Sequence, residues 1–479
     1  MVSFILPGNS ATGGYEVDNS LRFNDGDSAN LSRTQVAGNR TTFTFSTWVK
    51  RSALGTDQMI FNAASPANST DFRTLLRFGD ADVLQFYNND ATGGGVNMNL
   101  KTNRLFRDVS AWYHIVLRFD TTQSTEADRI RLYVNGVQET SFSTATYPSQ
   151  NADNTHFNYN GNTVKIGGSA YSDGDYFDGY MAEAVLCDGQ SLDPTSFGEF
   201  DEDSPTVWKP IDVSDLTFGN NGFYLDFEDS SALGTDVSGE GHNYTANNLA
   251  ATDQSIDTCT NNYATFNSIA PTTDITLSEG NLKGVYGTAD NRTVQTSTFG
   301  LSSGKWYWEI KIGGSTSPNN AMVGITQLST DTNTVLGTAD NSWAYRGYDG
   351  KVYHNNGDEG GSLNTFTDGD IIGIALNLDN LQGSLHKLYF SKNGTFQNSA
   401  DPTDFTSTTG VYGVDDNVDY FPAVSDAGSS ATPQFEINFG SPSFSISSGN
   451  SDANGYGNFE YSVPSGFYAI NSKNLAEFG

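Results

Sequence analysis

Residues 305–312 read Lys-Trp-Tyr-Trp-Glu-Ile-Lys-Ile, and this stretch decides the fold of the second half of the chain. Both tryptophans and both isoleucines fall on one face, whereas the lysines, the tyrosine and the glutamate fall on the other. This period of two is typical of a half-buried antiparallel strand. Further strand patterns follow at residues 322–325, 369–379, 387–394, 420–424 and 435–440. We therefore expect antiparallel sheet structure here.

In this order, the stretches resemble those of a SPRY domain, a bent β-sandwich used for binding. The resemblance covers about residues 285–440 and implies the same sandwich fold. It does not identify a ligand, because β-sandwiches host many functions.

The first half of the chain contains a second series of alternating stretches, at residues 42–50, 112–120, 131–136 and 177–186. The third of them ends in Asn135-Gly136, a pair typical of a tight β-hairpin. Together these stretches resemble a laminin-G or concanavalin A-like jelly roll over about residues 15–200. The predicted fold class is therefore all-β, with two antiparallel β-sandwiches.

The remaining segments give the expected domain organisation. Residues 1–14 are predicted to be an irregular lead-in, and residues 201–284 an ordered connector. The connector contains a strand pattern at residues 222–231, so it is expected to be folded and to complete a neighbouring sheet. Residues 441–479 are predicted to dock on the second sandwich as a C-terminal segment.

Charge and composition exclude several classes of function. The 479 residues carry a net charge of −32, and such an acidic surface repels phosphate backbones, so nucleic-acid binding is not expected. The N-terminal residues lack the charged and apolar regions of a signal peptide, and no transmembrane segment is predicted. Cys187 and Cys259 could pair, but two separate thiols are favoured, since a disulfide framework needs more cysteines.

The whole arrangement resembles structural proteins of tailed phages, especially marine ones. The resemblance rests on the order of the two domains, a Thr-Asn-Asn-Tyr-Ala-Thr motif at residues 260–265 and a Pro-Ser-Gly-Phe-Tyr-Ala tail at residues 464–469. It implies a virion protein made in the host cytoplasm, such as a tail fibre or other appendage that recognises a host-surface glycan or protein. It further implies other virion proteins as partners and a homo-oligomer, for example a trimer. A capsid decoration or spacer protein is the main alternative.

A glycan-degrading enzyme is a further alternative, because concanavalin A-like glucanases share this jelly roll. Such enzymes need two carboxylates that face one cleft. The nearest candidates are Glu199 and Asp201, but Glu202 points away and the stretch leads into a loop at Pro205. No histidine pair has metal-ligand spacing, and His114 is expected to be structural. The chain is therefore predicted not to be an enzyme.

Calcium is the one cofactor that the sequence suggests. Asp173, Asp175 and Asp178 set three carboxylates close together in a glycine-bearing loop, and Asp25 and Asp27 form a second acidic turn. Calcium binds six to eight oxygens of this kind. Aspartate and glycine also dominate ordinary turns, so a purely structural turn is the competing interpretation.

A ligand-binding site is predicted at Trp343, Tyr345, Arg346, Tyr348 and Asp349. Aromatic rings beside polar side chains suit sugar rings, whose C–H faces stack on indole or phenol. The competing interpretation is a strand with buried aromatics, as is usual at this place in SPRY-like domains.

Overall fold

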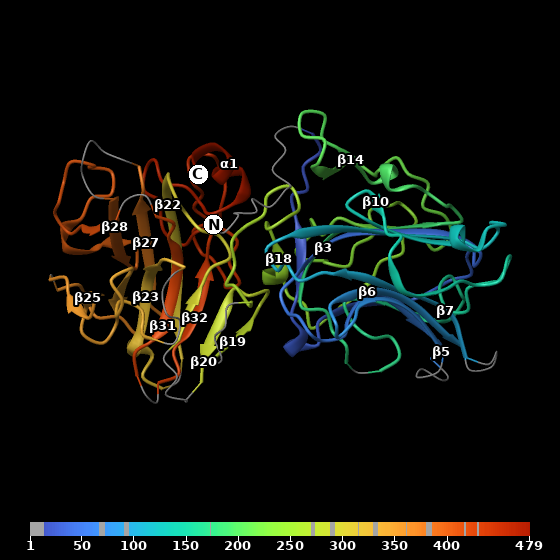
Figure 1. The fold of residues 1–479 in the computed structure, drawn as a ribbon, viewed down its shortest axis with the longest axis horizontal. Helices are drawn as coiled ribbons and strands as arrows, with labels where there is room; N and C mark the ends of the chain where they lie inside the picture. The colour runs from blue at the N-terminus through green and yellow to red at the C-terminus, as the bar shows by residue number, and fades with distance from the viewer. Residues whose placement is uncertain are drawn as a thin grey trace. The chain divides into compact units, whose positions relative to one another are not determined.

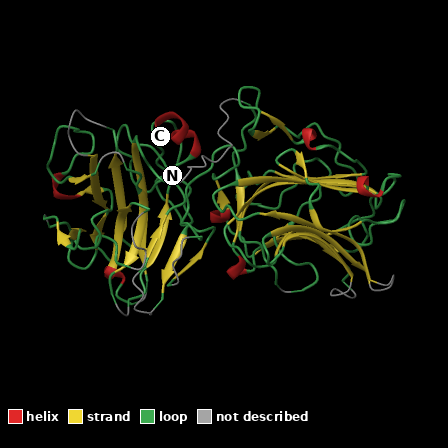
Figure 2. Ribbon diagram, viewed as in Figure 1, coloured by secondary structure: helices red, strands yellow, loops and turns green. Residues whose placement is uncertain are grey.

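The computed structural model describes residues 14–66, 72–90, 95–172, 174–269, 274–287, 293–314, 316–328, 334–360, 362–379, 386–415, 418–428 and 431–479. The chain divides into two compact units, Met1–Asn262 and Tyr263–Gly479. Both are built almost entirely from antiparallel strands (Figure 2). Among the described residues, the α-helix is α1 (Ser472–Phe478), and no helix is long and apolar enough to cross a bilayer. The predicted all-β class with two antiparallel sandwiches is confirmed.

The first unit contains two large sheets, which lie face to face in Figure 1. Sheet 1 has the order β10 (Val137–Gln138), β9 (Ile130–Val134), β8 (Trp112–Asp120), β3 (Thr42–Arg51), β13 (Gly179–Asp188), β1 (Ser20–Phe23) and β18 (Gln254–Ser255), and β16 (Phe223–Leu225) also pairs with β13. Sheet 2 has the order β11 (Phe142–Thr146), β7 (Gly95–Leu105), β6 (Val83–Asp90), β5 (Phe72–Phe78), β4 (Gln58–Ala64), β12 (Thr163–Ile166), β2 (Asn30–Thr34) and β17 (Thr245–Asn247).

The core of the first unit lies between these sheets. Sheet 1 contributes residues such as Phe43, Phe45 and Leu117, and sheet 2 contributes Phe61 and Phe86. The alternation along each strand places these side chains inward and leaves every second side chain on an outer face.

The outer face of sheet 1 is covered by the chain itself. The segment 193–262 supplies Phe197, Phe218 and Trp208, which pack with strand residues such as Val185 and Trp48 in two further apolar clusters. The same segment forms a small hairpin of β14 (Gly198–Phe200) and β15 (Trp208–Pro210) and adds β16, β17 and β18 to the large sheets. Of the segment expected to be an ordered connector, residues 201–262 are thus part of the first unit and residues 263–284 part of the second, and β16, within the expected strand pattern, extends a sheet of the first unit.

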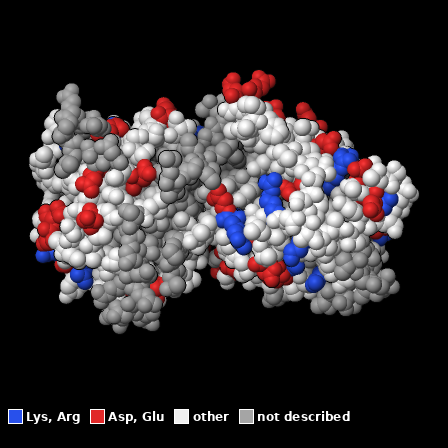
Figure 3. Space-filling view, in the orientation of Figure 1, with Lys and Arg blue, Asp and Glu red and all other residues white. Residues whose placement is uncertain are grey.

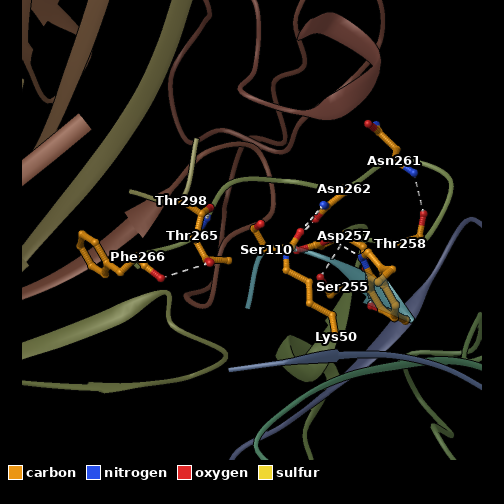
Figure 4. A network of polar contacts seen from close by, with 12 residues as sticks. Lys50, Ser110, Ser255, Asp257, Thr258, Asn261, Asn262, Thr265, Phe266 and Thr298 are labelled. Atoms are coloured by element: carbon orange, nitrogen blue, oxygen red, sulfur yellow. Dashed lines mark hydrogen bonds and ion pairs between the residues drawn. The ribbon is translucent and has the colours of Figure 1, made fainter. Parts of the chain in front are cut away.

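A buried ion pair ties the end of this segment to the centre of sheet 1 (Figure 4). The Lys50 ammonium, on β3, lies 2.7 Å from Asp257 Oδ2 and donates at 2.7 Å to Asn262 Oδ1. The indole N–H of Trp112 donates to the other carboxylate oxygen of Asp257 at 3.1 Å, and Asn262 donates to the Ser110 carbonyl at 2.6 Å. A buried charge needs such partners to offset the loss of water.

The second unit also contains two sheets. Sheet 3 has the order β19 (Ile275–Ser278), β20 (Lys283–Tyr286), β32 (Gln434–Asn438), β22 (Lys305–Gly313), β27 (Ile371–Asn377), β28 (His386–Lys392) and β29 (Thr395–Phe396), and β30 (Tyr412–Val414) pairs with β28. Sheet 4 has the order β21 (Val294–Thr296), β31 (Phe421–Asp426), β23 (Ala321–Thr326), β24 (Ser342–Arg346), β25 (Lys351–His354) and β26 (Gly357–Asp358). Trp306, Trp308 and Ile310 of β22 lie in the core between them, as the alternation predicts.

The other face of β22 holds the C-terminal segment. The buried carboxylate of Glu309 accepts hydrogen bonds from the backbone N–H groups of Glu460 and Tyr461, at 2.9 and 2.8 Å. Tyr307 packs edge-on against Phe459. Residues 441–479 therefore cover part of the outer face of sheet 3.

Candidate functional site

The outer face of sheet 2 carries a row of polar and aromatic side chains. In the pairing of β5, β6 and β7, Arg77 lies opposite Gln85, and Gln85 lies opposite Lys101, which forms one row across the sheet. In the next row, Tyr87 lies opposite Asn99. Directly paired residues of an antiparallel sheet point to the same side. All of these side chains alternate with core residues such as Phe86 and Leu100, so they point outward.

A loop after β12 adds to this face. Asn62 of β4 donates to the Gly168 carbonyl at 2.5 Å and accepts from the Ala170 N–H at 2.6 Å, which fixes the loop on the sheet. The loop brings Tyr171 over the sheet, where the Arg73 guanidinium lies 4.1 Å from the centre of its ring. We call the set Arg73, Arg77, Gln85, Tyr87, Asn99, Lys101 and Tyr171 the polar face.

Hydrogen bonds order the polar face internally. Arg77 Nε donates to Gln85 Oε1 at 3.0 Å, and Gln85 Nε2 donates to Asn99 Oδ1 at 2.9 Å. Arg77 also pairs with Asp57. Arg73 lies 5.9 Å from the ring centre of Tyr87. Except for the buried Gln85, the side chains are half-buried, so the face is both held in place and accessible to a ligand.

The predicted ligand site in the second unit does not form one platform. Trp343 and Tyr345 are 2% and 0% exposed, because β24 alternates and turns both rings into the core. Trp343 stacks on His354 with ring centres 4.1 Å apart. The expectation that these two rings contact ligand is therefore corrected: they are core residues.

The other three residues of that prediction do lie together at the surface. Tyr348 is 61% exposed, and the Arg346 guanidinium lies 5.3 Å from its ring centre. Arg346 also lies 3.7 Å from Asp349, which accepts from the Tyr353 hydroxyl at 2.7 Å. This small surface turn offers one exposed ring.

The predicted calcium loop is the loop that positions Tyr171. Asp173 lies outside the described residues, the Asp178 side chain is buried, and Asp175 accepts from the Tyr171 hydroxyl at 2.8 Å. Asp25 and Asp27 lie in a short 3-10 turn. No group of three His, Cys, Asp or Glu side chains suited to a metal is found in the part of the chain that the structure describes. Calcium binding stays a prediction.

The carboxylates considered for hydrolysis are engaged elsewhere. On the β14–β15 hairpin, the Lys209 ammonium lies 3.4 Å from Glu199 and 3.2 Å from Asp201. The backbone N–H of Ser204, and then the Lys209 ammonium, lower the pKa of Asp201 below its usual value, so that group is a poor proton donor. Cys187 and Cys259 are both buried free thiols.

Sequence reasoning missed the polar face. Its residues come from three strands and one loop, and each stretch by itself is an ordinary alternating strand. The signal that could have found it is the set of outward-pointing residues at alternate positions of 73–77 and 85–89. This set combines arginine, glutamine, tyrosine and asparagine, which are typical of ligand-binding surfaces.

Two family models match the chain. The model described as "Concanavalin A-like lectin/glucanases superfamily" matches residues 23–192, and the SPRY domain model matches residues 305–438. The chain thus carries a concanavalin A-like domain followed by a SPRY domain. Domains of these two kinds point to carbohydrate or protein binding.

Similar solved structures each cover about a third of the chain. The SPRY domain of human HERC1 is 23% identical, over 34% of this chain and 91% of that one, with a TM-score of 0.28. The TRIM65 PSpry domain is 15% identical, over 36% and 88%, with a TM-score of 0.27. A heptameric SAP-like pentraxin from Limulus polyphemus is 15% identical, over 37% and 78%, with a TM-score of 0.28. No curated protein matches the sequence.

Proposed function

We propose that this chain is a non-enzymatic binding protein of a tailed-phage virion, and that its polar face binds a glycan on the host surface. The observation that carries the binding role is the difference between the two outer faces of the first unit. Sheet 1 is covered by side chains from the segment 193–262, such as Phe197 and Trp208, whereas sheet 2 presents accessible tyrosines, amides and cations. The virion assignment rests on the resemblance in domain order and motifs.

The chemistry of the polar face suits a sugar. A tyrosine ring can stack on the apolar face of a pyranose, while amide and guanidinium groups donate hydrogen bonds to hydroxyl oxygens. Tyr87 lies next to Asn99 in the register, so a ring and a hydrogen-bonding amide are adjacent. One such site binds weakly, and several copies in an oligomeric appendage, such as a trimer, raise the avidity.

The non-enzymatic part of the proposal follows from the composition of the face. Asp57 already pairs with Arg77, and Glu199 and Asp201 pair with Lys209 on another element. A glycosidase needs one carboxyl group to donate a proton and a second to act as base or nucleophile. The described outward residues of β5 and β6 are arginine, leucine, glutamine, tyrosine and asparagine, which cannot fill those roles.

The test is binding of the oligomer to an array of bacterial envelope glycans, followed by affinity measurements on the best ligands. We expect Tyr87→Ala to weaken binding at least tenfold, or about 1.4 kcal/mol. Tyr159→Ala is the matched control, because Tyr159 also lies at the surface of the first unit under an arginine, with Arg40 4.9 Å from its ring centre. Absence of glycan binding, or equal losses in both variants, would overturn the proposal. Location of the chain on the capsid lattice by electron microscopy would favour the decoration role.

A further inference from the structure

The polar face differs in charge from the chain that carries it. The whole chain has a net charge of −32, yet Arg73 and Arg77 point outward from β5, and Lys101 points outward from β7, two strands away. Figure 3 shows that most basic side chains in view lie on the first unit. Of the three cations, Arg77 has a carboxylate partner in Asp57.

Arg73 is held in place by rings rather than by a carboxylate. Its guanidinium stacks on Tyr171 at 4.1 Å, with Tyr87 at 5.9 Å, and within the described ranges no carboxylate lies within 4.0 Å of it. Its Nε–H is buried and has no hydrogen-bond partner among the described residues. Most other arginines of this unit, such as Arg51 and Arg118, pair with an aspartate. The two terminal NH2 groups of the Arg73 guanidinium are not among the buried unpartnered atoms, and such a fork of donors matches a planar anionic group.

The hydrogen-bond network leaves donors rather than acceptors on the surface. Arg77 donates to the Gln85 oxygen, and Gln85 donates to the Asn99 oxygen, so each amide oxygen already accepts one hydrogen bond. The Asn99 amide N–H groups and the Lys101 ammonium remain on the outward rows, and for Lys101 no carboxylate partner is found in the described part of the chain. A face rich in donors and poor in acceptors complements a ligand rich in acceptors.

We infer that the polar face binds an anionic oligosaccharide, a sugar chain that bears carboxylate, phosphate or sulfate groups. The anionic group lies on the Arg73 guanidinium, and a neighbouring sugar ring packs against Tyr87. Lys101 provides a second positive charge two strands away from β5. The inference rests on the proposed glycan-binding function and adds the chemical class of the glycan.

The test compares ligands that differ in charge alone. Affinities of the full chain are measured for an oligogalacturonate and for its methyl ester, which is the neutral form of the same sugar chain. A sulfated and a phosphorylated oligosaccharide of similar length distinguish the source of the charge. We expect the charged oligogalacturonate, or one of the other two anions, to bind at least tenfold more tightly than the ester.

The variants assign that preference to Arg73. Arg73→Gln should lose most of the preference for the charged chain, because only the more distant Lys101 charge then remains without a carboxylate partner among the described residues of the face. Arg73→Lys should recover part of the preference, because it restores the charge without the planar fork. Arg40→Gln is the control: Arg40 also lies over a tyrosine, but it already pairs with Asp153 at 3.0 Å. The control should keep the preference, and unchanged melting temperatures would show that all variants are folded.

The outcomes separate this inference from the proposed function. Equal binding of charged and neutral chains, with Tyr87→Ala weakening both, overturns the anionic class and leaves glycan binding standing. Failure to bind any glycan overturns both. A lower particle mass of Arg73→Gln in light scattering without glycan would also overturn the inference, since the face would then contact a second copy of the chain.

Discussion

Single residues in the first unit show how burial controls protonation. His114 lies between Trp48 and Trp208, and the Trp208 indole N–H donates to its Nδ1 at 2.9 Å. Since Nδ1 must accept, the proton lies on Nε2, which donates to Ser46 Oγ at 2.8 Å. Burial lowers the pKa of His114 to about 3. The histidine is thus a neutral structural residue.

Glu183 is the acidic counterpart of His114 in the same sheet. It lies at a register shift in β13 with a φ of 51°, and its buried carboxyl accepts from the Tyr224 hydroxyl at 2.8 Å. Burial raises the pKa of Glu183 from 4.5 to about 8, more than the hydrogen bond from Tyr224 lowers it. At neutral pH the folded unit therefore still holds a proton on Glu183 that the unfolded chain has already released near pH 4.5.

These two groups predict the pH dependence of the first unit. Between pH 4.5 and about 8, Glu183 lowers the stability as the pH rises, because the unfolded chain is ionised there and the folded unit is not. Between pH 6.5 and about 3, His114 lowers the stability as the pH falls, because the unfolded chain is protonated there and the folded unit is not. The two slopes offset each other between pH 4.5 and 6.5, so the net loss comes from Glu183 above pH 6.5 and from His114 below pH 4.5. Each slope is at most about 1.4 kcal/mol per pH unit. Melting curves from pH 3 to 9 should show Glu183→Gln losing less stability than the wild type between pH 6.5 and 8; parallel curves would contradict this.

A second prediction at this scale separates the two kinds of aromatic residue in β24 and its turn. Trp343→Ala should destabilise the second unit by about 3–5 kcal/mol, because it empties a core position. Tyr348→Ala should change the unfolding free energy by less than about 0.5 kcal/mol, because that ring is exposed. Urea unfolding measures both, and a stable Trp343→Ala protein would restore the exposed-platform interpretation.

Individual elements were predictable where a pattern is local. The alternation at residues 305–312 is strand β22, and Asn135-Gly136 is the turn between β9 and β10. Strand β16 falls within the strand pattern at residues 222–231. Strands β17 and β18 were not assignable, because each pairs with a strand distant in the chain, such as β1 with β18. The polar face was not assignable, because it depends on the register of β5, β6 and β7 and on the distant loop after β12. Trp343 and Tyr345 are two residues apart, so they must point to the same face of β24. The sequence pattern could not show whether that face is buried or exposed.

The docking of the C-terminal segment on sheet 3 depends on Glu309. Glu309→Ala removes the acceptor of two backbone N–H groups and should destabilise the second unit by about 1–3 kcal/mol per buried donor left unpaired. Glu309→Gln should cost less, because one oxygen remains. Glu436→Ala on the neighbouring strand β32 is the control, since that side chain is half-exposed. Calorimetry reports the change, and equal effects of Glu309→Ala and Glu436→Ala would contradict the role of Glu309.

The loop at residues 167–178 carries the calcium prediction. If Asp173, Asp175 and Asp178 bind calcium, the ion at a hundredfold excess over its dissociation constant should add about 2.7 kcal/mol to the stability of the first unit. Chelation should then lower its melting temperature and weaken glycan binding, because the loop positions Tyr171. An unchanged melting curve in chelator would support the turn interpretation.

At the scale of the whole molecule, the two units should fold independently, because each has its own core. A fragment of residues 14–262 should melt at the temperature of the first unit in the full chain. A fragment of residues 14–200 should fail to fold, because it lacks β16, β17, β18 and the Asp257 partner of Lys50. Circular dichroism of the two fragments checks this, and a folded shorter fragment would show that residues 201–262 are dispensable.

The Lys50–Asp257 pair also sets the order of events during synthesis. Lys50 lies on a central strand of sheet 1, yet its counterion follows 207 residues later. At about 5–20 residues per second, the ribosome needs roughly 10–40 s to reach it. Lys50 lies on the outer face of sheet 1, beside Trp112 and Tyr180, so until then its ammonium stays in water. Covering that face without Asp257 would bury an unpaired charge, which is strongly unfavourable. The outer face of sheet 1 therefore cannot be covered piece by piece as the chain emerges; its closing waits for the residues near Asp257 and is a late event of translation.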